Sequence, residues 1–182
     1  MDARLIPVKQ LVIVPFEGMP GPVLRTLAGD LAARGVAARI DPPVPLPGGG
    51  YVRSRGQYRA ESLLAFVGGH AARHVLAVTH RYLFAGGLNF VFGIALPGGA
   101  CVVSTARLLA GADDALFRAR LLKEAVHELG HTLGLEHCAD AGCVMHFSNS
   151  VADTDRKSDA YCRRCAARLA PPPRRRARSL FR

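Results

Sequence analysis

The first forty residues alternate between a compact apolar run and an amphipathic segment. Residues 10–15 are apolar, include β-branched side chains and are followed by polar residues and glycine, which is typical of a buried strand. Residues 22–34 repeat their apolar positions at three- and four-residue spacing, and Gly35 follows where a helix would end. A second strand is expected over residues 36–40. The pattern therefore predicts a strand, a helix and a strand in succession.

The middle of the chain combines one long loop with several short elements. Residues 41–50 hold four prolines and three consecutive glycines, so no regular element is expected there. A helical pattern over residues 61–67 and a strand-like run over residues 75–79 follow. The segments 87–93 and 101–105 are both rich in strand formers, and we expect them to pair as a hairpin.

The last third is predicted to be mainly helical. From Ala112 the apolar positions follow a helical period, and Gly134 marks the expected end of this helix. The chain then reads as irregular to about Lys157, followed by a short helix over residues 159–169. Three prolines end that helix, and the arginine-rich tail, residues 171–182, is expected to be disordered.

These elements predict a mixed β-sheet with flanking helices, an α+β fold with the character of an α/β sandwich. The length of 182 residues fits one domain with a short appendage. We expect a single domain over residues 1–170. Its N-terminal part would run to about residue 134, and residues 135–170 would form a small helical C-terminal part.

The net charge of +10 is concentrated at the C-terminus. Five arginines lie in the last nine residues, and without them the excess is halved. Because such a tail is separable from the fold, nucleic acid is not expected as a partner. No apolar run is long enough for a membrane span or for the core of a signal peptide, which favours a cytoplasmic protein, and we expect a monomer.

The residues that carry chemistry lie in one stretch, where His127, Glu128, His131, Gly134 and His137 spell HExxHxxGxxH. Histidines four apart on a helix are separated by about 6 Å along the axis and about 40° around it, so both imidazoles can reach one ion. Gly134 would break the helix and let His137 return to the same ion. Zinc held by three imidazoles keeps a fourth position for water, and Glu128 is placed to activate that water as general base and acid.

Other interpretations of the histidines remain open. A bare HExxH can occur by chance in a surface helix, and the glycine and third histidine at their offsets are what favour catalysis. Imidazole also suits copper, nickel and iron, although zinc is preferred. The remaining histidines lack this spacing and are interpreted as non-ligands: His70, His74, His80 and His146.

Four of the five cysteines follow the histidines in two close pairs, Cys138 with Cys143 and Cys162 with Cys165. Without an export signal, metal binding is favoured over two disulfides or free thiols. Cys101 stands alone in a strand-like context, which indicates a small buried hydrophobe.

The histidine motif followed by Cys138, Cys143, Met145, Cys162 and Cys165 in this order resembles the archaemetzincin family of metallopeptidases, within the metzincin clan. The resemblance covers residues 126–166 and extends to the strand-like residues 88–93. Sixteen residues separate Met145 from Cys162, one fewer than in the family's pattern.

The resemblance implies two zinc ions per chain, one catalytic and one structural. The four cysteines would hold the structural zinc, and Met145 would form the Met-turn, a hydrophobic floor beneath the catalytic ion. In metzincins an extended substrate pairs with an edge strand above the active helix, by main-chain hydrogen bonds. The candidate residues for this strand are Leu88, Asn89, Phe90, Val91 and Phe92.

The preferred hypothesis is a zinc-dependent metallopeptidase that hydrolyses peptide bonds in a peptide or protein substrate. One alternative is a non-catalytic zinc-binding scaffold whose metal site is closed, for example by the loop at residues 41–50. Another is a nucleic-acid-binding protein that uses the four-cysteine module and the arginine tail, with binding that falls steeply as salt rises.

Overall fold

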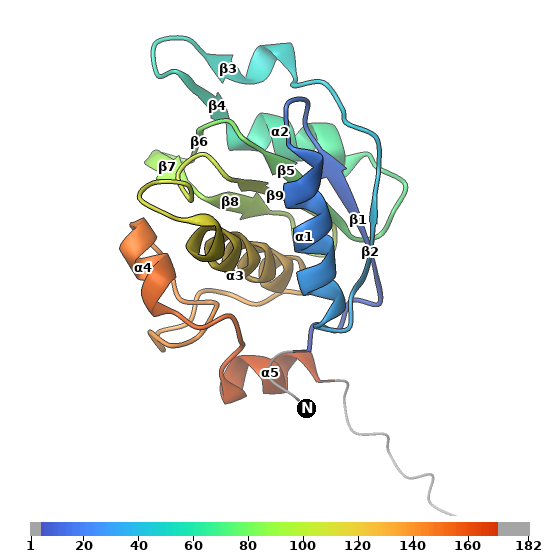
Figure 1. The fold of residues 1–182 in the computed structure, drawn as a ribbon, viewed down its shortest axis with the longest axis vertical. Coiled ribbons are helices and arrows are strands. Elements are labelled where there is room, and N and C mark those ends of the chain that lie inside the picture. Colours follow the sequence, from blue (N-terminus) through green and yellow to red (C-terminus); the bar gives the residue numbers. More distant parts are fainter. Residues whose placement is uncertain (1–4, 171–182) are drawn as a thin grey trace, which may run out of the picture.

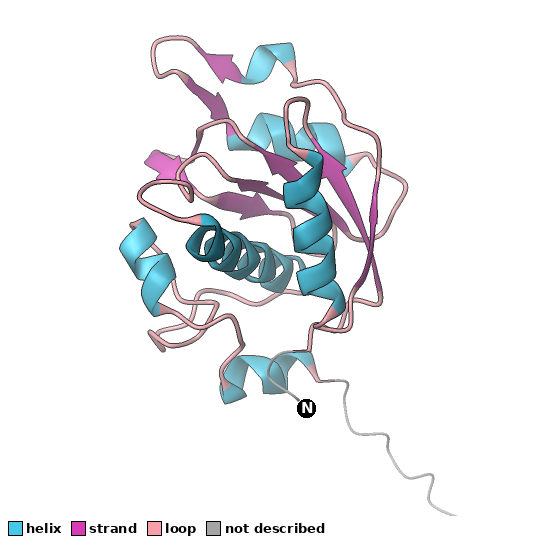
Figure 2. Cartoon of the chain, viewed as in Figure 1, coloured by secondary structure: helices cyan, strands magenta, loops and turns pink. Residues whose placement is uncertain are grey.

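The computed structural model describes residues 5–170, which form nine strands, five helices and one short 3-10 turn (Figure 2). The strands are β1 Gln10–Pro15, β2 Ala37–Ile40, β3 Tyr51–Val52, β4 Gln57–Arg59, β5 Val75–Thr79, β6 Leu83–Ala85, β7 Leu88–Val91, β8 Gly93–Ala95 and β9 Ala100–Ser104. The helices are α1 Gly21–Ala32, α2 Ala60–Gly68, α3 Asp114–Thr132, α4 Val151–Arg156 and α5 Arg163–Leu169, and the 3-10 turn is Gly48–Gly50.

A five-stranded sheet in the order β2-β1-β5-β9-β8 forms the centre of the molecule (Figure 1). Its first four strands run parallel, and β8 pairs antiparallel with β9 at the edge. Helices α1 and α3 cover one face and α2 covers the other, the arrangement that buries parallel strands on both sides. The predicted class, a mixed sheet with flanking helices, is confirmed.

Strand β5 illustrates why the apolar runs become strands. Leu76 and Val78 point into the core shared with α1 and α3, whereas Val75 and Ala77 belong to the core beneath α2. Because both faces are covered, such a strand reads as a continuous apolar run and not as an alternating one. The predicted strands and helices of the first eighty residues are confirmed, with ends that shift by up to two residues.

A second sheet, in the order β3-β4-β6-β7, lies beside the first. The predicted hairpin between residues 87–93 and 101–105 is wrong in its pairing. β9 pairs instead with Gly93–Ala95, and Leu88–Val91 pairs with β6 in the second sheet. The chain thus changes sheet at Phe92, inside a run that looks uniform in the sequence.

Two further expectations are corrected between residues 41 and 59. Gly48–Gly50 forms a 3-10 turn where no regular element was expected, and at its end a Cβ on Gly50 would crowd Ser62 and Tyr58. The polar residues 51–59 contain the short strands β3 and β4, which the sequence did not predict. Strands of two and three residues are too short to establish an alternating pattern.

The C-terminal part also differs from its prediction. α4 lies within the region expected to be irregular, and α5 begins four residues later than predicted. α4 buries only Thr154 fully, so it shows no apolar period, and it is held at its start by Ser150, whose hydroxyl accepts from the Asp153 amide. Residues 159–162 bend without forming a helix, and Cys162 takes the N-cap position of α5 in an extended conformation.

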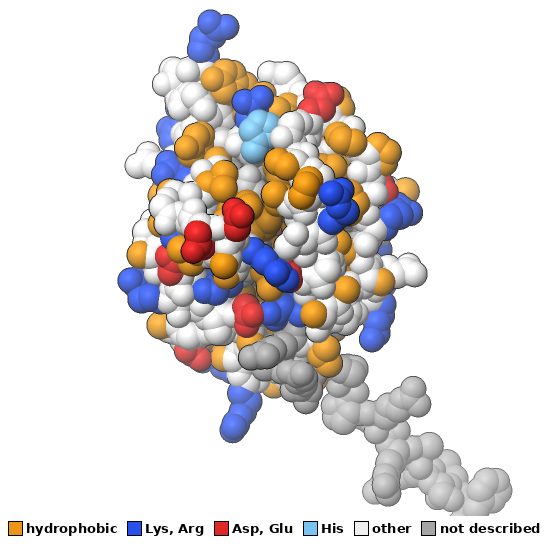
Figure 3. All heavy atoms as spheres, viewed as in Figure 1, with side chains coloured by type: hydrophobic (Ala, Val, Ile, Leu, Met, Phe, Trp, Pro, Cys, Tyr) orange, Lys and Arg blue, Asp and Glu red, His pale blue; other side chains and the backbone are white. Residues whose placement is uncertain are grey.

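The predicted disorder of residues 171–182 lies outside the described residues. On the face that presents α1 and α3, basic, acidic and hydrophobic side chains are interspersed (Figure 3). Within residues 5–170, no helix has the length and apolar content needed to cross a membrane.

Candidate metal centres and cleft

Helix α3 carries the first two histidines toward its C-terminal end. It begins at a side-chain cap, since Asp113 Oδ1 accepts a hydrogen bond from the Leu116 amide at 2.8 Å. The same helix packs against β8 and β9, so its last turns lie beside the edge of the central sheet. His127 and His131 therefore project from a rigid element at the sheet edge.

Gly134 ends α3 in the way the sequence predicted. Its φ is +85°, a left-handed conformation that glycine adopts without a Cβ penalty. The Gly134 amide donates to the His131 carbonyl and the Leu135 amide donates to the Gly130 carbonyl, each at 3.0 Å, which is the Schellman pattern. The reversed chain then places His137 beside the two helical histidines.

The three imidazoles of the motif converge. Ring centroids are 4.6 Å apart for His127 and His131, 4.8 Å for His131 and His137, and 5.3 Å for His127 and His137. One ring nitrogen from each histidine lies within 4.8 Å of the others. The other histidines, predicted to be non-ligands, do not join a group of this kind among the described residues.

The hydrogen bonds of these rings fit a metal ion. His127 Nδ1 lies 2.8 Å from the Val144 carbonyl and His131 Nδ1 lies 2.7 Å from the Leu135 carbonyl, so both Nδ1 atoms carry the proton. Their Nε2 atoms then face each other at 3.0 Å with lone pairs only. Tetrahedral zinc with bonds of about 2.0–2.1 Å sets ligand nitrogens about 3.3 Å apart, close to this spacing.

Burial also favours the neutral form of the imidazoles, the form that binds metals, most strongly for His127, since His137 is an exposed residue. Desolvation lowers the pKa of His127 well below its usual value, and the nearby Lys157 ammonium lowers it further. Burial likewise lowers the pKa of His131 and of His137. Neutral imidazoles with oriented Nδ1–H groups are what a zinc site requires.

Met145 lies directly beneath the histidine-bearing turn and is fully buried. A Cβ atom on Gly130 would collide with its sulfur and would crowd the ring of Tyr161. Gly130 is therefore the residue that lets the methionine approach the helix between His127 and His131. The role expected for Met145, a floor beneath the catalytic ion, stays a prediction, and this contact is the structural feature that bears on it.

Glu128 is almost completely buried, with 4% of its surface exposed, and its carboxyl group faces the cleft. Burial raises the pKa of Glu128 well above the usual value, and the nearby Glu124 carboxylate adds to the effect. Its Oε2 atom has no hydrogen-bond partner among the described residues. Gly93 in β8 makes room for this carboxylate, because a Cβ there would overlap Glu128 Oε1.

A cleft of about 720 Å³ runs between the end of α3 and the strands β7 and β8. Four of the five residues predicted for the substrate strand line it, namely Leu88, Phe90, Val91 and Phe92, whereas Asn89 does not. Gly93, Ile94 and Ala95 of β8 also line it, and β8 is the edge strand of the central sheet. None of residues 41–50 lines the cleft, so that loop does not close it.

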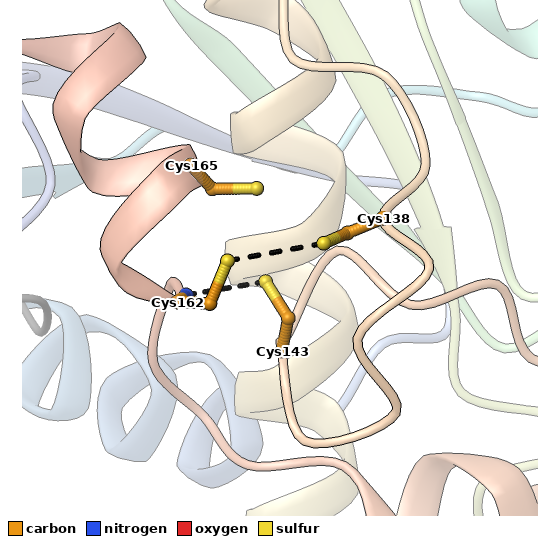
Figure 4. Close-up of side chains that lie close together, drawn as sticks. All are labelled: Cys138, Cys143, Cys162 and Cys165. Carbon is orange, nitrogen blue, oxygen red and sulfur yellow. Dashed lines mark hydrogen bonds between the residues drawn. The ribbon is translucent and has the colours of Figure 1, made fainter.

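The four cysteines of the C-terminal part form a second cluster (Figure 4). Cys138 and Cys143 come from the loop after α3, and Cys162 and Cys165 come from the start of α5, with all four side chains directed at one point. All four are free thiols, so the disulfide interpretation is wrong. The Sγ atoms of Cys138 and Cys162 are 3.8 Å apart, which matches the spacing of about 3.8 Å expected from tetrahedral Zn–S bonds of about 2.3 Å.

Hydrogen bonds prepare this cluster for a cation. The Cys162 amide donates to Cys143 Sγ at 3.2 Å, and the Arg164 guanidinium donates to Cys138 Sγ at 3.3 Å. Burial opposes ionisation, but hydrogen bonds from the Asp140 amide and from Arg164 outweigh it and lower the pKa of Cys138 to about 7. Burial instead raises the pKa of Cys143 and of Cys165, so it is the convergence of four sulfurs, with Cys138 as the most acidic thiol, that favours a closed zinc site. Cys101 lies apart and is buried, as predicted.

Sequence reasoning missed Lys157, whose buried ammonium group lies 2.9 Å from Glu124 and 3.5 Å from His127 Nδ1. One signal was available. The chain has only three lysines among 24 basic residues, and two of them, Lys123 and Lys157, connect α3 with the segment around α4.

These features define a zinc metallopeptidase of the metzincin type. A helix presents two histidines, a sharp turn returns a third, and a carboxylate without a partner among residues 5–170 lies in the cleft. A sequence model of peptidase family M54 matches residues 50–171. The chain belongs to this family, the archaemetzincins.

Individual relatives agree with this assignment. The chain is 38% identical over 175 residues to the archaemetzincin of Pyrococcus furiosus, which covers 87% of this chain and 91% of that protein. It is 50% identical over 127 residues to that of Methanopyrus kandleri, covering 68% and 72%. The crystal structure of archaemetzincin from Archaeoglobus fulgidus complexed with malonate superposes with a TM-score of 0.81, at 39% identity, covering 87% of this chain and 99% of that one.

Proposed function

We propose that this metallopeptidase holds its catalytic zinc with His127, His131 and His137 and uses Glu128 as general base and then general acid. The observation that carries the proposal is the Glu128 carboxylate. It is buried at the cleft, its Oε2 has no hydrogen-bond partner within residues 5–170, and it follows His127, whose Nε2 faces that of His131. A zinc ion in this place supplies a Lewis acid that polarises a peptide carbonyl and lowers the pKa of water.

The role of Glu128 follows from its surroundings. A buried carboxylate with a free oxygen accepts a proton from the attacking water at Oε2 and delivers it to the nitrogen of the leaving amine. The raised pKa of Glu128, caused first by burial, brings its basicity closer to that task. Gly93 maintains the space around it and also belongs to the strand along which a peptide would lie.

The second zinc is proposed to be structural. The four cysteine sulfurs come from two segments that are far apart in the sequence, and a metal there ties α5 to the loop that follows α3. That loop includes Val144, which orients His127, and Met145, which supports the turn. A site of four thiolates requires reduced cysteines, so we propose a reducing compartment, such as the cytoplasm.

An extended peptide is proposed to bind along β7 and β8, above α3. Leu88, Phe90 and Phe92 offer apolar contacts in the cleft wall, and β8 presents a free edge on the side away from β9. Pairing with a strand edge uses main-chain groups and places the scissile bond near the histidines and Glu128.

The substitution Glu128→Gln tests the central claim, because it keeps the shape of the side chain and removes its basicity. We expect hydrolysis of a peptide library to fall by about 10² to 10⁴-fold, while zinc content measured by elemental analysis stays at the wild-type value. Glu17→Gln, an exposed residue away from the cleft, is the matched control and should retain full activity. Wild-type rates for Glu128→Gln would reject the general-base role.

A further inference from the structure

The second sheet exposes a surface of arginines stacked on aromatic rings. Residues 51–60 and 80–93, which contain all four strands of this sheet, carry Arg53, Arg55, Arg59 and Arg81 and no acidic residue, and the adjacent Glu61 carboxylate accepts from the Gly86 amide at 3.0 Å. Arg107 joins them from the segment after β9.

Three of these guanidinium groups are held in place by aromatic rings. The Cζ atoms of Arg55 and Arg59 lie 4.4 and 5.2 Å from the Phe84 ring centroid, and that of Arg107 lies 4.1 Å from the Phe90 centroid. Arg59 and Phe84 are also paired neighbours on β4 and β6, so their side chains share one face of the sheet. Stacking fixes the plane of each cation and leaves its N–H edges free to bind.

Those N–H edges are only partly used. Arg55 donates to the Gln57 side chain at 3.0 Å and to the Asn89 carbonyl at 3.2 Å. By contrast, Arg59 and Arg107 form no side-chain hydrogen bond or ion pair with any residue of 5–170, and Arg107 Nε is buried without a partner. An ordered guanidinium with unsatisfied donors is suited to a carboxylate.

The Arg107 end of this surface adjoins the cleft, although none of the three arginines lines it. The ring of Phe90, on which Arg107 stacks, lines the cleft and packs against Phe92 with ring centroids 5.3 Å apart. On the α3 side, the cleft is lined by Glu124, Glu128 and Glu136. A peptide that extends from the cleft toward the second sheet therefore meets a cationic surface. The peptide residues that meet it are not those next to the scissile bond.

We propose that the stacked arginines Arg55, Arg59 and Arg107 bind acidic side chains in the flank of the peptide, so that this peptidase prefers substrates with aspartate or glutamate a few residues from the cleaved bond. The inference rests on the proposed function, because it assumes that the substrate lies along β7 and β8. It makes the second sheet, and not only the cleft, a determinant of the substrate class.

The test is a binding measurement on the zinc-loaded, full-length Glu128→Gln protein, which does not require hydrolysis. Labelled peptides with one neutral centre and flanks of three aspartates, three serines or three lysines would be titrated by fluorescence anisotropy. The double substitution Arg59→Gln with Arg107→Gln should weaken binding of the aspartate peptide about tenfold and leave the serine peptide unchanged. Arg25→Gln with Arg73→Gln, two exposed arginines that line neither the cleft nor this surface, changes the net charge equally and should have no such effect.

Several outcomes would overturn the inference. One is that the Glu128→Gln protein binds the three peptides with equal affinity. Another is that the double variant loses the same affinity for the serine peptide as for the aspartate peptide. A ten-nucleotide single-stranded DNA that binds more tightly than the aspartate peptide, and loses that binding in the double variant, would assign the surface to nucleic acid. Hydrolysis of the serine peptide by the wild type is measured separately. Failure there would reject the catalytic proposal while the titration still decides the role of the arginines.

Discussion

The ammonium group of Lys157 lies 2.9 Å from the carboxylate of Glu124, and the side chains of both residues are withdrawn from solvent, with 0% and 3% exposed. Thr154 Oγ1 also donates to Glu124 Oε1 at 3.0 Å, and Lys157 donates to the His146 carbonyl at 3.4 Å. The pair therefore joins α3, one turn before His127, to the end of α4 and to the loop that carries Met145. The pair thereby holds α3, which carries His127, against the segment around α4.

Replacing Lys157 with methionine keeps the apolar stem and leaves Glu124 buried without its partner. We expect the free energy of unfolding to fall by about 3 to 5 kcal/mol, because the loss of one member of a buried ion pair strands the other charge. Urea denaturation of the zinc-loaded protein measures this. Lys9→Met, at an exposed lysine, is the control and should change stability by less than about 0.5 kcal/mol.

A second substitution separates the charge from the packing. Adding Glu124→Gln to Lys157→Met removes the stranded charge, so the double variant should be more stable than Lys157→Met alone. If Lys157→Met unfolds at the wild-type urea concentration, the pair does not hold α4 against α3.

The contact between Gly130 and Met145 predicts that alanine is tolerated differently at two helical glycines, Gly130 in α3 and Gly29 in α1. Gly130→Ala forces its Cβ against the Met145 sulfur and the Tyr161 ring, which is itself held by a hydrogen bond from its hydroxyl to the Val126 carbonyl at 3.1 Å. We expect a loss of about 1 to 3 kcal/mol from overpacking. Gly29→Ala in α1 meets no atom within 4 Å and should gain up to about 1 kcal/mol. Equal melting temperatures for the two variants would contradict the proposed floor.

The ion pair of Arg120 with Asp155 predicts a dependence on pH. The guanidinium donates to both carboxylate oxygens at 2.7 Å, and these hydrogen bonds lower the pKa of Asp155. Since the folded pKa lies below the unfolded one, the contribution to stability is present above about pH 3.9 and is lost as the pH falls through the folded value. Asp155→Asn should therefore be less stable than wild type at pH 6, and the gap in urea midpoint should shrink toward pH 3. A gap that is constant with pH would mean that the ion pair contributes nothing.

Much of the fold was predictable because β1 and β5 are buried on both faces and each early helix has one apolar face. The change of sheet at Phe92 was not, because most of residues 88–94 are strand formers on both sides of that position, and the partners of β7 and β8 are set by tertiary contacts. α4 escaped prediction for a related reason. Its stability comes from polar contacts with α3, such as those of Lys123 with the Thr154 and Asp155 carbonyls, which leave no apolar period in the sequence.

The ligand-like residues were predictable because their chemistry requires fixed spacing. A histidine at position 127 constrains positions 128, 131, 134 and 137 through the geometry of one helix end. Residues that act through long-range contacts carry no such spacing. Gly93 of β8 makes room for Glu128 of α3, and Lys157 contacts Glu124 across 33 positions of sequence. Only the folded chain brings the two residues of each pair together.

Loss of the histidine site should leave the cysteine site intact, whereas loss of the cysteine site should weaken zinc binding at the histidine site. Elemental analysis of the untagged protein is expected to find about two zinc ions, and His131→Ala should lower this to one, because the cysteine cluster does not depend on that imidazole. Cys165→Ala should lose the structural zinc and also bind the catalytic zinc more weakly, since the freed loop holds the Val144 carbonyl that orients His127. Cys101→Ala is the matched control and should retain both ions. The remaining zinc of Cys165→Ala should therefore be removed by a chelator more easily than the zinc of the wild type. Equal resistance to the chelator would show that the structural site does not support the catalytic one.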